Sequence, residues 1–161
     1  MSPSLSIPLL AASPLAVLLL ASVVRPIVAR PRRTHVDRLL LAILATKTLA
    51  SLAWLVVSRP DAPVTLRVAR LDLFGVESAL GVAFRFDRVS LVVSATVGAV
   101  AWAVYRYSLR YLDGEARLGR FLGWLGFTIA SVESLVLAGN LVQLAASWMM
   151  VSTGLHFLLV H

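Results

Sequence analysis

The sequence predicts an all-α integral membrane protein with about five transmembrane helices and one β-hairpin-like loop on the extracytoplasmic side. The chain of 161 residues is 59% hydrophobic and 14% charged, whereas a soluble domain carries about 25% charged residues. Apolar runs of about 20 residues recur along it, and a helix of that length crosses the hydrocarbon of a bilayer. We therefore expect residues 1–161 to form a single membrane domain without a large soluble domain.

Five apolar runs are expected to form the transmembrane helices. They cover residues 5–24, 39–57, 89–105, 121–139 and 141–160. The first run has no basic segment before it, and its arginines follow the apolar stretch, which indicates a retained helix rather than a signal peptide. Gly139 and Asn140 leave almost no loop between the last two runs. Either these helices meet in a sharp hairpin, or each ends a few residues from its expected boundary.

The arginines predict the orientation of these helices. Segments 25–38 and 106–120 hold five and four arginines against one and two acidic residues, whereas the loop 58–88 holds five against four. Cytoplasmic loops are enriched in Lys and Arg, so we place the two short, arginine-dense segments in the cytoplasm. We expect the protein to lie in the cell inner membrane. The N-terminus then lies outside and the C-terminus inside. This topology accounts for the net charge of +7, and we expect no nucleic-acid partner.

The loop 58–88 does not have the pattern of a helix. VTLRVARLDL, residues 64–73, alternates apolar and polar side chains, which is typical of a strand with one buried face. A second short run, GVAFRFD, covers residues 81–87. The two runs predict a β-hairpin that lies on the outer membrane surface.

Several kinds of chemistry are excluded by the residue types present. Cysteine is absent, so this chain cannot form disulfides or supply thiolates to zinc or to an iron–sulfur cluster. The sequence has no phosphate-binding loop, dinucleotide glycine pattern, HExxH motif or nucleophile elbow. We expect no cofactor, no metal and no catalytic site in this chain.

Two charged residues inside apolar runs are the main candidates for an ion or proton path, namely Glu133 and Lys47. An ionisable residue within a membrane is costly and usually marks such a path. Alternatively, Glu133 holds helices together as a protonated or hydrogen-bonded side chain, and Lys47 extends along its helix toward water. Lys47 lies eight residues from the nearer boundary of its run, which makes the latter difficult. Glu133 is its obvious partner, although no sequence pattern shows that the two residues meet.

His156 is a third candidate for the path. It follows Ser152 by four residues and Trp148 by eight, so the three share one helical face. Imidazole titrates in the physiological range, which suits a proton relay, whereas the alternative is a hydrogen bond between helices. Asn140 lies seven residues after Glu133, on the same face if the helix continues.

Residues at the helix ends are expected to anchor them. Asp87 precedes the run 89–105 and is expected to cap that helix or to pair with Arg88. Tyr105, Tyr107 and Tyr111 at the inner end are expected to form an aromatic belt at the membrane surface.

A series of short motifs follows in a fixed order from Phe84 onward. They are an Asp before a helix, a Tyr-Ser pair at its inner end, a second Tyr, and an Asn-Leu step followed by a Trp: Asp87, Tyr107-Ser108, Tyr111, Asn140-Leu141 and Trp148. This pattern resembles the antiporter-like membrane subunits of respiratory complex I and of cation/proton antiporters.

One departure from the complex I pattern favours a sister family. In complex I subunits the Trp is followed by a Glu that serves in proton transfer, but in this chain the position is Met149. The residues that follow resemble the DabB-type membrane subunit of the inorganic-carbon accumulation complex. The matching positions are Ser152, Leu155-His156 and Leu158-Leu159, with Tyr111-Leu112 and Gly114-Glu115 in the preceding loop.

The resemblance covers residues 84–161 and implies a function. It implies a membrane subunit of an energy-coupled bicarbonate or CO2 uptake complex that conducts protons or sodium ions. Its implied partner is a large, zinc-containing DabA-type cytoplasmic subunit that docks on the basic inner loops. Known members carry many more helices, so we expect this chain to be an N-terminal fragment. The alternatives are a subunit of NADH-quinone oxidoreductase of the L type or of a multisubunit cation/proton antiporter, and a truncated scaffold protein that would tolerate Glu133→Gln.

Overall fold

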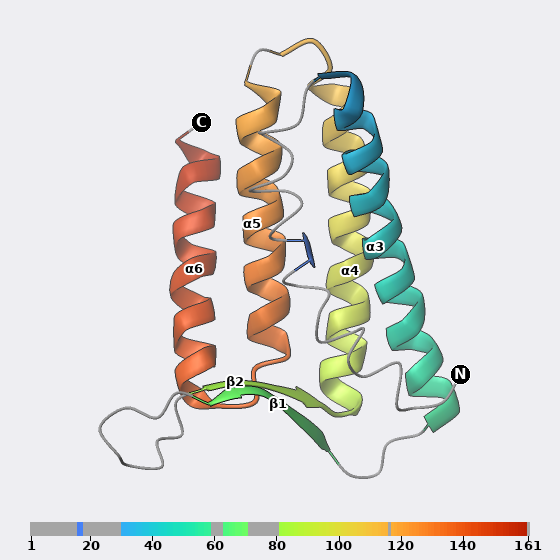
Figure 1. Cartoon of the computed structure of the whole chain (residues 1–161), viewed down its shortest axis with the longest axis vertical. Coiled ribbons are helices and arrows are strands. Elements are labelled where there is room, and N and C mark those ends of the chain that lie inside the picture. The colour runs from blue at the N-terminus through green and yellow to red at the C-terminus, as the bar shows by residue number, and fades with distance from the viewer. Residues whose placement is uncertain (1–15, 18–29, 59–62, 71–80, 116, 161) are drawn as a thin grey trace.

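Four long helices run side by side in the order of the sequence (Figure 1). The computed structural model describes residues 16–17, 30–58, 63–70, 81–115 and 117–160. The helices are α3 (Arg30–Ser58), α4 (Arg88–Tyr111), α5 (Leu118–Val136) and α6 (Leu141–Leu159). α3 packs against α4, α4 against α5, and α5 against α6. Two strands, β1 (Val64–Arg70) and β2 (Gly81–Phe86), lie across one end of the row (Figure 1).

The structure is mostly helical, as predicted, and three of its helices are candidates for the predicted membrane spans. Among the described residues, three segments are long and apolar enough to cross a membrane: Thr34–Val56, Arg88–Tyr111 and Leu141–Leu159. They correspond to the predicted runs 39–57, 89–105 and 141–160. The run 121–139 corresponds to α5, which does not reach that apolarity because it contains Arg120, Glu133 and several glycines. The run 5–24 lies outside the described residues, apart from 16–17.

The predicted pair of strands forms a two-stranded antiparallel sheet. Val64 lies opposite Phe86 and Arg70 opposite Gly81, with an irregularity between Arg67 and Ala69. Residues 71–73 of the predicted first strand lie outside the described part of the chain. Both predicted runs therefore form strands, the first over Val64–Arg70 and the second over Gly81–Phe86.

Strand β2 is also joined to the turn between α5 and α6. The Arg85 N–H donates to the Leu137 carbonyl over 2.9 Å, and the Gly139 N–H donates to the Ala83 carbonyl over 2.6 Å. The Ala83 N–H donates to Gln143 Oε1 over 2.9 Å. A Cβ on residue 139 would lie 2.6 Å from the Ala83 oxygen, so only glycine permits this approach. α5 ends at Val136, three residues before its expected boundary, so a short turn over residues 137–140 joins it to α6, which is the second of the two alternatives that the sequence left open.

Asp87 caps α4, as predicted. Its Oδ1 accepts from the Ser90 N–H, and Ser90 Oγ accepts from the Asp87 N–H, both over 2.8 Å. This reciprocal arrangement satisfies two backbone donors at the helix start. The Ser90 N–H lowers the pKa of the Asp87 carboxyl because it stabilises the ionised form. Arg85 forms an ion pair with Asp87 over 3.3 Å.

Two apolar clusters fill the space among the helices. The smaller one connects the hairpin to the helices and consists of Trp54, Phe84, Phe86, Leu91 and Leu137. The larger one lies toward the opposite end and includes Leu40, Leu44, Ala101, Tyr105, Leu122 and Ile129. Along each of α3, α4 and α5, several residues lie between those that belong to the smaller cluster and those that belong to the larger one. The polar residues of the candidate functional site lie among these intervening residues.

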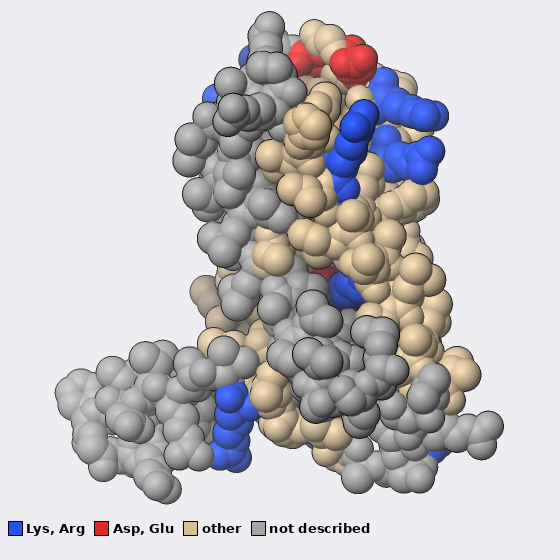
Figure 2. Space-filling model, turned by 45° about the vertical axis from the view of Figure 1, so that its right-hand side comes forward, with Lys and Arg blue, Asp and Glu red and all other residues tan. Residues whose placement is uncertain are grey.

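Charged side chains gather at the ends of the helices. Figure 2 shows Lys and Arg together at the end that carries the α4–α5 loop, and again beside the hairpin, with mostly uncharged surface between. The described parts of both predicted cytoplasmic segments, 30–38 and 106–115 with 117–120, lie at the end opposite the sheet (Figure 1). The helices therefore alternate in direction, as a multi-pass topology requires. The end of α6 also lies at this basic end (Figure 1).

Candidate functional site

Lys47 and Glu133 form a buried ion pair between α3 and α5. Lys47 Nζ contacts Glu133 Oε1, and the two side chains are 2% and 1% exposed. Removing two charges from water is costly unless they neutralise each other at close range. The two charged residues that the sequence singled out therefore meet, although no sequence pattern required it.

Ser94 on α4 holds both members of the pair. Its Oγ donates to Glu133 Oε2 over 3.3 Å, and its carbonyl accepts from Lys47 Nζ over 3.4 Å. The Ser94 side chain is itself buried. Three helices therefore contribute to the site. Ser94 was not among the predicted site residues, because a serine in an apolar helix is common and does not stand out by itself.

Gly98 allows α3 to approach α4 closely beside the ion pair. A Cβ on residue 98 would lie 2.5 Å from Thr48 Oγ1 and 3.7 Å from Lys47 Nζ. Thr48 on α3 occupies the space beside Gly98, and its hydroxyl donates to the Leu44 carbonyl over 2.8 Å. The missing side chain therefore makes room for α3 where Lys47 extends toward α5. Gly98 follows Ser94 by one helical turn, and this spacing is the signal that could have drawn attention to both.

The site retains unused hydrogen-bonding capacity. Among the described residues, no hydrogen bond is made by Ser51 Oγ. Ser51 is fully buried and lies one helical turn after Lys47, on the same face of α3. The site thus offers an amine, a carboxylate and two hydroxyls. Within the described ranges no group of three or more His, Asp or Glu side chains suits a metal ion.

Apolar side chains separate the ion pair from both ends of the bundle. Toward the sheet lies the smaller cluster, in which the Trp54 and Phe86 rings are 5.5 Å apart at 51°. Toward the basic end lies the larger cluster, with Leu44 and Ile129 among its buried members. The pair is therefore enclosed between the two apolar clusters, near the middle of α3 but closer to the sheet-side ends of α4 and α5.

A second buried polar contact lies nearer the basic end. The Tyr105 hydroxyl donates to Asp37 Oδ1 over 2.9 Å, and both side chains are buried. Tyr105 was predicted to belong to an aromatic belt, and this is wrong, because its side chain faces α3. Tyr107 and Tyr111 are exposed and stacked with ring centroids 5.2 Å apart, which fits the belt.

The remaining predicted site residues lie away from the ion pair. His156 and Ser152 are on an exposed face of α6, where the Ser152 hydroxyl donates to the Trp148 carbonyl over 3.1 Å. Asn140 caps α6, and its side chain accepts from the Gln143 N–H over 2.7 Å. Because α5 ends at Val136, the helix does not continue from Glu133 to Asn140, and the two do not share a helical face.

Membrane-length helices of alternating direction that enclose an ion pair define a multi-pass membrane protein. A sequence model described as the N-terminus of chain 5 of NADH-ubiquinone oxidoreductase (complex I) matches residues 76–122. This stretch contains the Asp87 cap, Ser94 and Gly98. Lys47 and Glu133 lie outside it.

Individual relatives carry two kinds of name. The probable inorganic carbon transporter subunit DabB1 of Halothiobacillus neapolitanus is 37% identical over 73 residues, which is 45% of this chain and 13% of that protein. NADH-ubiquinone oxidoreductase chain 5 of Acanthamoeba castellanii is 37% identical over 65 residues, 40% of this chain and 10% of that protein. NADH-quinone oxidoreductase subunit L of Campylobacter jejuni is 30% identical over 78 residues, 48% of this chain and 13% of that protein.

These comparisons confirm the resemblance that the sequence motifs indicated. Over less than half of its length, this chain is related to antiporter-like membrane subunits, including those named DabB and subunit L. The matched stretch spans 10 to 13% of the length of these three relatives.

Proposed function

We propose that this chain belongs to a membrane subunit that conducts protons or sodium ions and thereby drives inorganic-carbon uptake by a cytoplasmic partner. The observation that supports this function is the buried Lys47–Glu133 ion pair held by Ser94. A membrane protein retains ionisable groups buried among its helices mainly where they serve transport, since the same helices could pack with apolar residues.

The geometry supports a simple exchange step at Glu133. An arriving proton binds a carboxylate oxygen and neutralises it, which removes the attraction to Lys47. The ammonium group then keeps the Ser94 carbonyl as its acceptor. Release of the proton restores the pair. Occupancy of Glu133 thereby changes the force between α3 and α5, and a transport protein needs such a difference in energy between its states.

The partner and the orientation follow from the same proposal. Two relatives are named as probable inorganic carbon transporter subunits, and we infer a DabA-type partner, a large zinc-containing subunit, for this chain as well. It docks at the basic end formed by the start of α3 and the α4–α5 loop. In this proposal the chain lies in the cell inner membrane and its basic end faces the cytoplasm. The N-terminus then lies outside and the end of α6 inside.

The second candidate function is a subunit of NADH-quinone oxidoreductase of the L type or of a cation/proton antiporter. Other relatives carry the names of such oxidoreductase subunits. Met149 argues against this second function. In the complex I subunits that the sequence resembles, a proton-transferring Glu follows the Trp, whereas in this chain Met149 follows Trp148. A scaffold role is the third candidate. It differs from the other two because a scaffold would tolerate Glu133→Gln.

The experiment uses the complete complex in inverted membrane vesicles with a pH-sensitive and a sodium-sensitive dye. We expect Glu133→Gln to abolish coupled ion movement. Asp87→Asn is the matched control, because that carboxylate lies outside the pair at the start of α4. Unchanged ion movement in Glu133→Gln would contradict the proposal and favour the scaffold. Loss of ion movement with intact bicarbonate accumulation would contradict the coupling to carbon uptake.

A further inference from the structure

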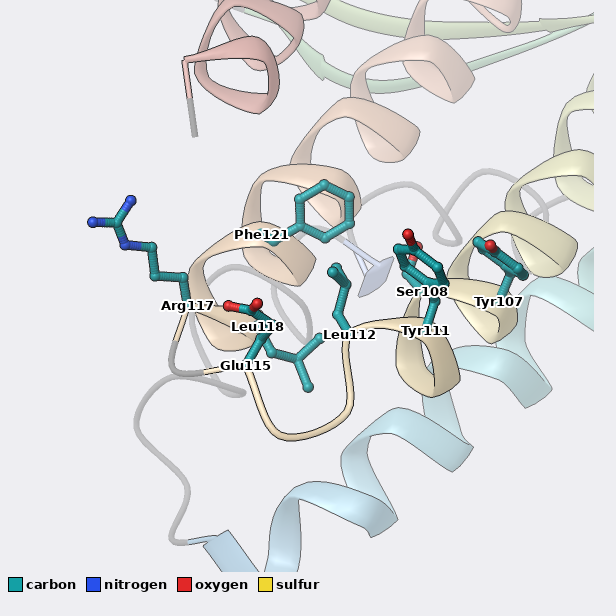
Figure 3. Close-up of a pocket in the computed structure, with 8 residues that line it drawn as sticks. All are labelled: Tyr107, Ser108, Tyr111, Leu112, Glu115, Arg117, Leu118 and Phe121. Atoms are coloured by element: carbon teal, nitrogen blue, oxygen red, sulfur yellow. The ribbon is translucent and has the colours of Figure 1, made fainter.

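Two apolar grooves flank the start of α5, and Arg117 lines both of them. The larger has a volume of about 540 Å³ and lies where the end of α4 meets the start of α5. Its lining residues are Tyr107, Ser108, Tyr111, Leu112, Glu115, Arg117, Leu118 and Phe121 (Figure 3). The smaller has a volume of about 160 Å³ and lies between α5 and α6, lined by Arg117, Arg120, Trp124, Phe157 and Val160. The two grooves are therefore adjacent around one cationic side chain.

The larger groove has an apolar floor and an aromatic wall. Leu112 and Phe121 lie centrally, and the stacked Tyr107 and Tyr111 lie to one side of them (Figure 3). Arg117 lies on the other side and points away from the tyrosines (Figure 3). This groove therefore presents hydrocarbon and aromatic surface within, with its cation at the margin.

The smaller groove repeats this arrangement. Trp124 and Phe157 stack with their ring centroids 4.1 Å apart at 14°, and they join α5 to α6 beside the groove. Arg120 accompanies Arg117 in lining it. Two guanidinium groups thus border this second, mostly aromatic surface.

We propose that this end of α5 binds an anionic phospholipid, with its phosphate at Arg117 and Arg120 and one acyl chain in each groove. The grooves lie where the spanning segments of α4 and α6 end, at Tyr111 and Leu159. That is the depth at which a lipid headgroup meets its chains. Guanidinium groups bind phosphate in a bidentate manner, and basic pockets between membrane helices bind anionic headgroups.

The surrounding charges favour an anion and locate it. The α4–α5 region carries Arg106, Arg110, Arg117 and Arg120 against Asp113 and Glu115. Glu115 lines the larger groove and repels a phosphate there. The headgroup is therefore directed toward Arg120, on the α6 side of Arg117. The binding of this lipid does not depend on ion conduction, so this proposal and the proposed function can fail separately.

The test measures binding of phosphatidylglycerol to the full chain in detergent by native mass spectrometry. Two arginines near a lipid surface contribute enough that we expect Arg117→Gln with Arg120→Gln to weaken binding by about tenfold or more. Arg110→Gln is the matched control, because it removes the same charge from an exposed position that lines neither groove. Equal weakening by Arg110→Gln would overturn the site in favour of a diffuse basic surface.

Further measurements test the proposal if the double variant folds poorly. Glu115→Gln is expected to strengthen phosphatidylglycerol binding, because it removes a repulsive charge without removing a ligand. Phosphatidylcholine should bind more weakly than phosphatidylglycerol, and inorganic phosphate alone should not compete with the lipid. Equal binding of the two lipids, or competition by phosphate at similar concentration, would overturn the two-chain anionic lipid. A protein partner that occupies the grooves and is not displaced by phosphatidylglycerol would overturn it as well.

Discussion

Lys47 and Glu133 belong to helices that are separated in the row by α4, and their ion pair joins α3 directly to α5. Each charge depends on the other for its stability in an apolar environment. Removing one partner of a buried ion pair destabilises a protein by about 3 to 5 kcal/mol, whereas replacing both by apolar residues is often neutral.

A double-mutant cycle tests this dependence. We expect Lys47→Met and Glu133→Gln each to lower the unfolding temperature in detergent. The double variant should be more stable than the sum of the two losses predicts, because no unpaired charge remains. Additive losses would show that the two residues do not stabilise each other.

Ser94→Ala is expected to destabilise the protein by about 1.5 to 3 kcal/mol, because a hydrogen bond to a charged group is lost in a buried position. Thr96→Ala is the control, since the exposed Thr96 hydroxyl donates only to the Val92 carbonyl of its own helix among the described residues. Chemical unfolding of both variants in detergent makes the comparison. Similar small losses in the two variants would show that Ser94 contributes nothing to the pair.

Tyr105→Phe should destabilise the protein by about 1.5 to 3 kcal/mol, because the buried Asp37 carboxylate loses a donor. Tyr107→Phe removes the same hydroxyl from an exposed ring and should leave stability within about 0.5 kcal/mol of the unmodified chain. The same unfolding measurement compares the two. Equal effects would show that the Tyr105 hydroxyl does not stabilise the Asp37 carboxylate.

Gly139→Ala is expected to be more disruptive than Gly98→Ala. An added Cβ at 139 meets the Ala83 backbone at 2.6 Å, whereas at 98 it meets the end of the Thr48 side chain at 2.5 Å. A side chain can rotate away, but the hydrogen-bonded backbone of β2 cannot, so overpacking at 139 costs about 1 to 3 kcal/mol. Limited proteolysis of the hairpin should report the difference. Faster cleavage in Gly98→Ala than in Gly139→Ala would contradict it.

The Asp87 cap gives the start of α4 a pH dependence. Because the Ser90 N–H lowers the pKa of this carboxyl in the folded protein, the unfolded chain holds the proton more tightly. The stability that the cap contributes is therefore present above about pH 4 and is lost as the pH falls through the folded pKa. Unfolding temperatures between about pH 6 and pH 2.5 should show this loss, and Asp87→Asn should show less of it. An identical profile for both chains would contradict the assignment.

The sequence predicted which residues are unusual better than it predicted where they lie. Charge inside an apolar run singled out Lys47 and Glu133 without any knowledge of packing. Helical spacing correctly placed Ser152 and His156 on one face, but spacing cannot tell whether another helix covers that face. For this reason their exposed position on α6 could not be predicted.

Other errors arose because local structure depends on distant contacts. The face shared by Glu133 and Asn140 required an unbroken helix, but the turn after α5 is fixed by its hydrogen bonds to β2. Tyr105 has the same side chain as its neighbours Tyr107 and Tyr111, and only its position opposite α3 buries it. Ser94 gave no signal because its role depends on two residues from other helices.

The modest apolarity of α5 has a consequence for biosynthesis. A nascent segment enters the bilayer largely by its own apolarity, and a charged residue such as Glu133 opposes its entry. α3 is synthesised before α5, so the counter-ion of Glu133, Lys47, has already left the ribosome when Glu133 does. The ion pair thus makes α3 an insertion partner for α5, and the order of the helices along the chain becomes part of how the protein reaches its membrane.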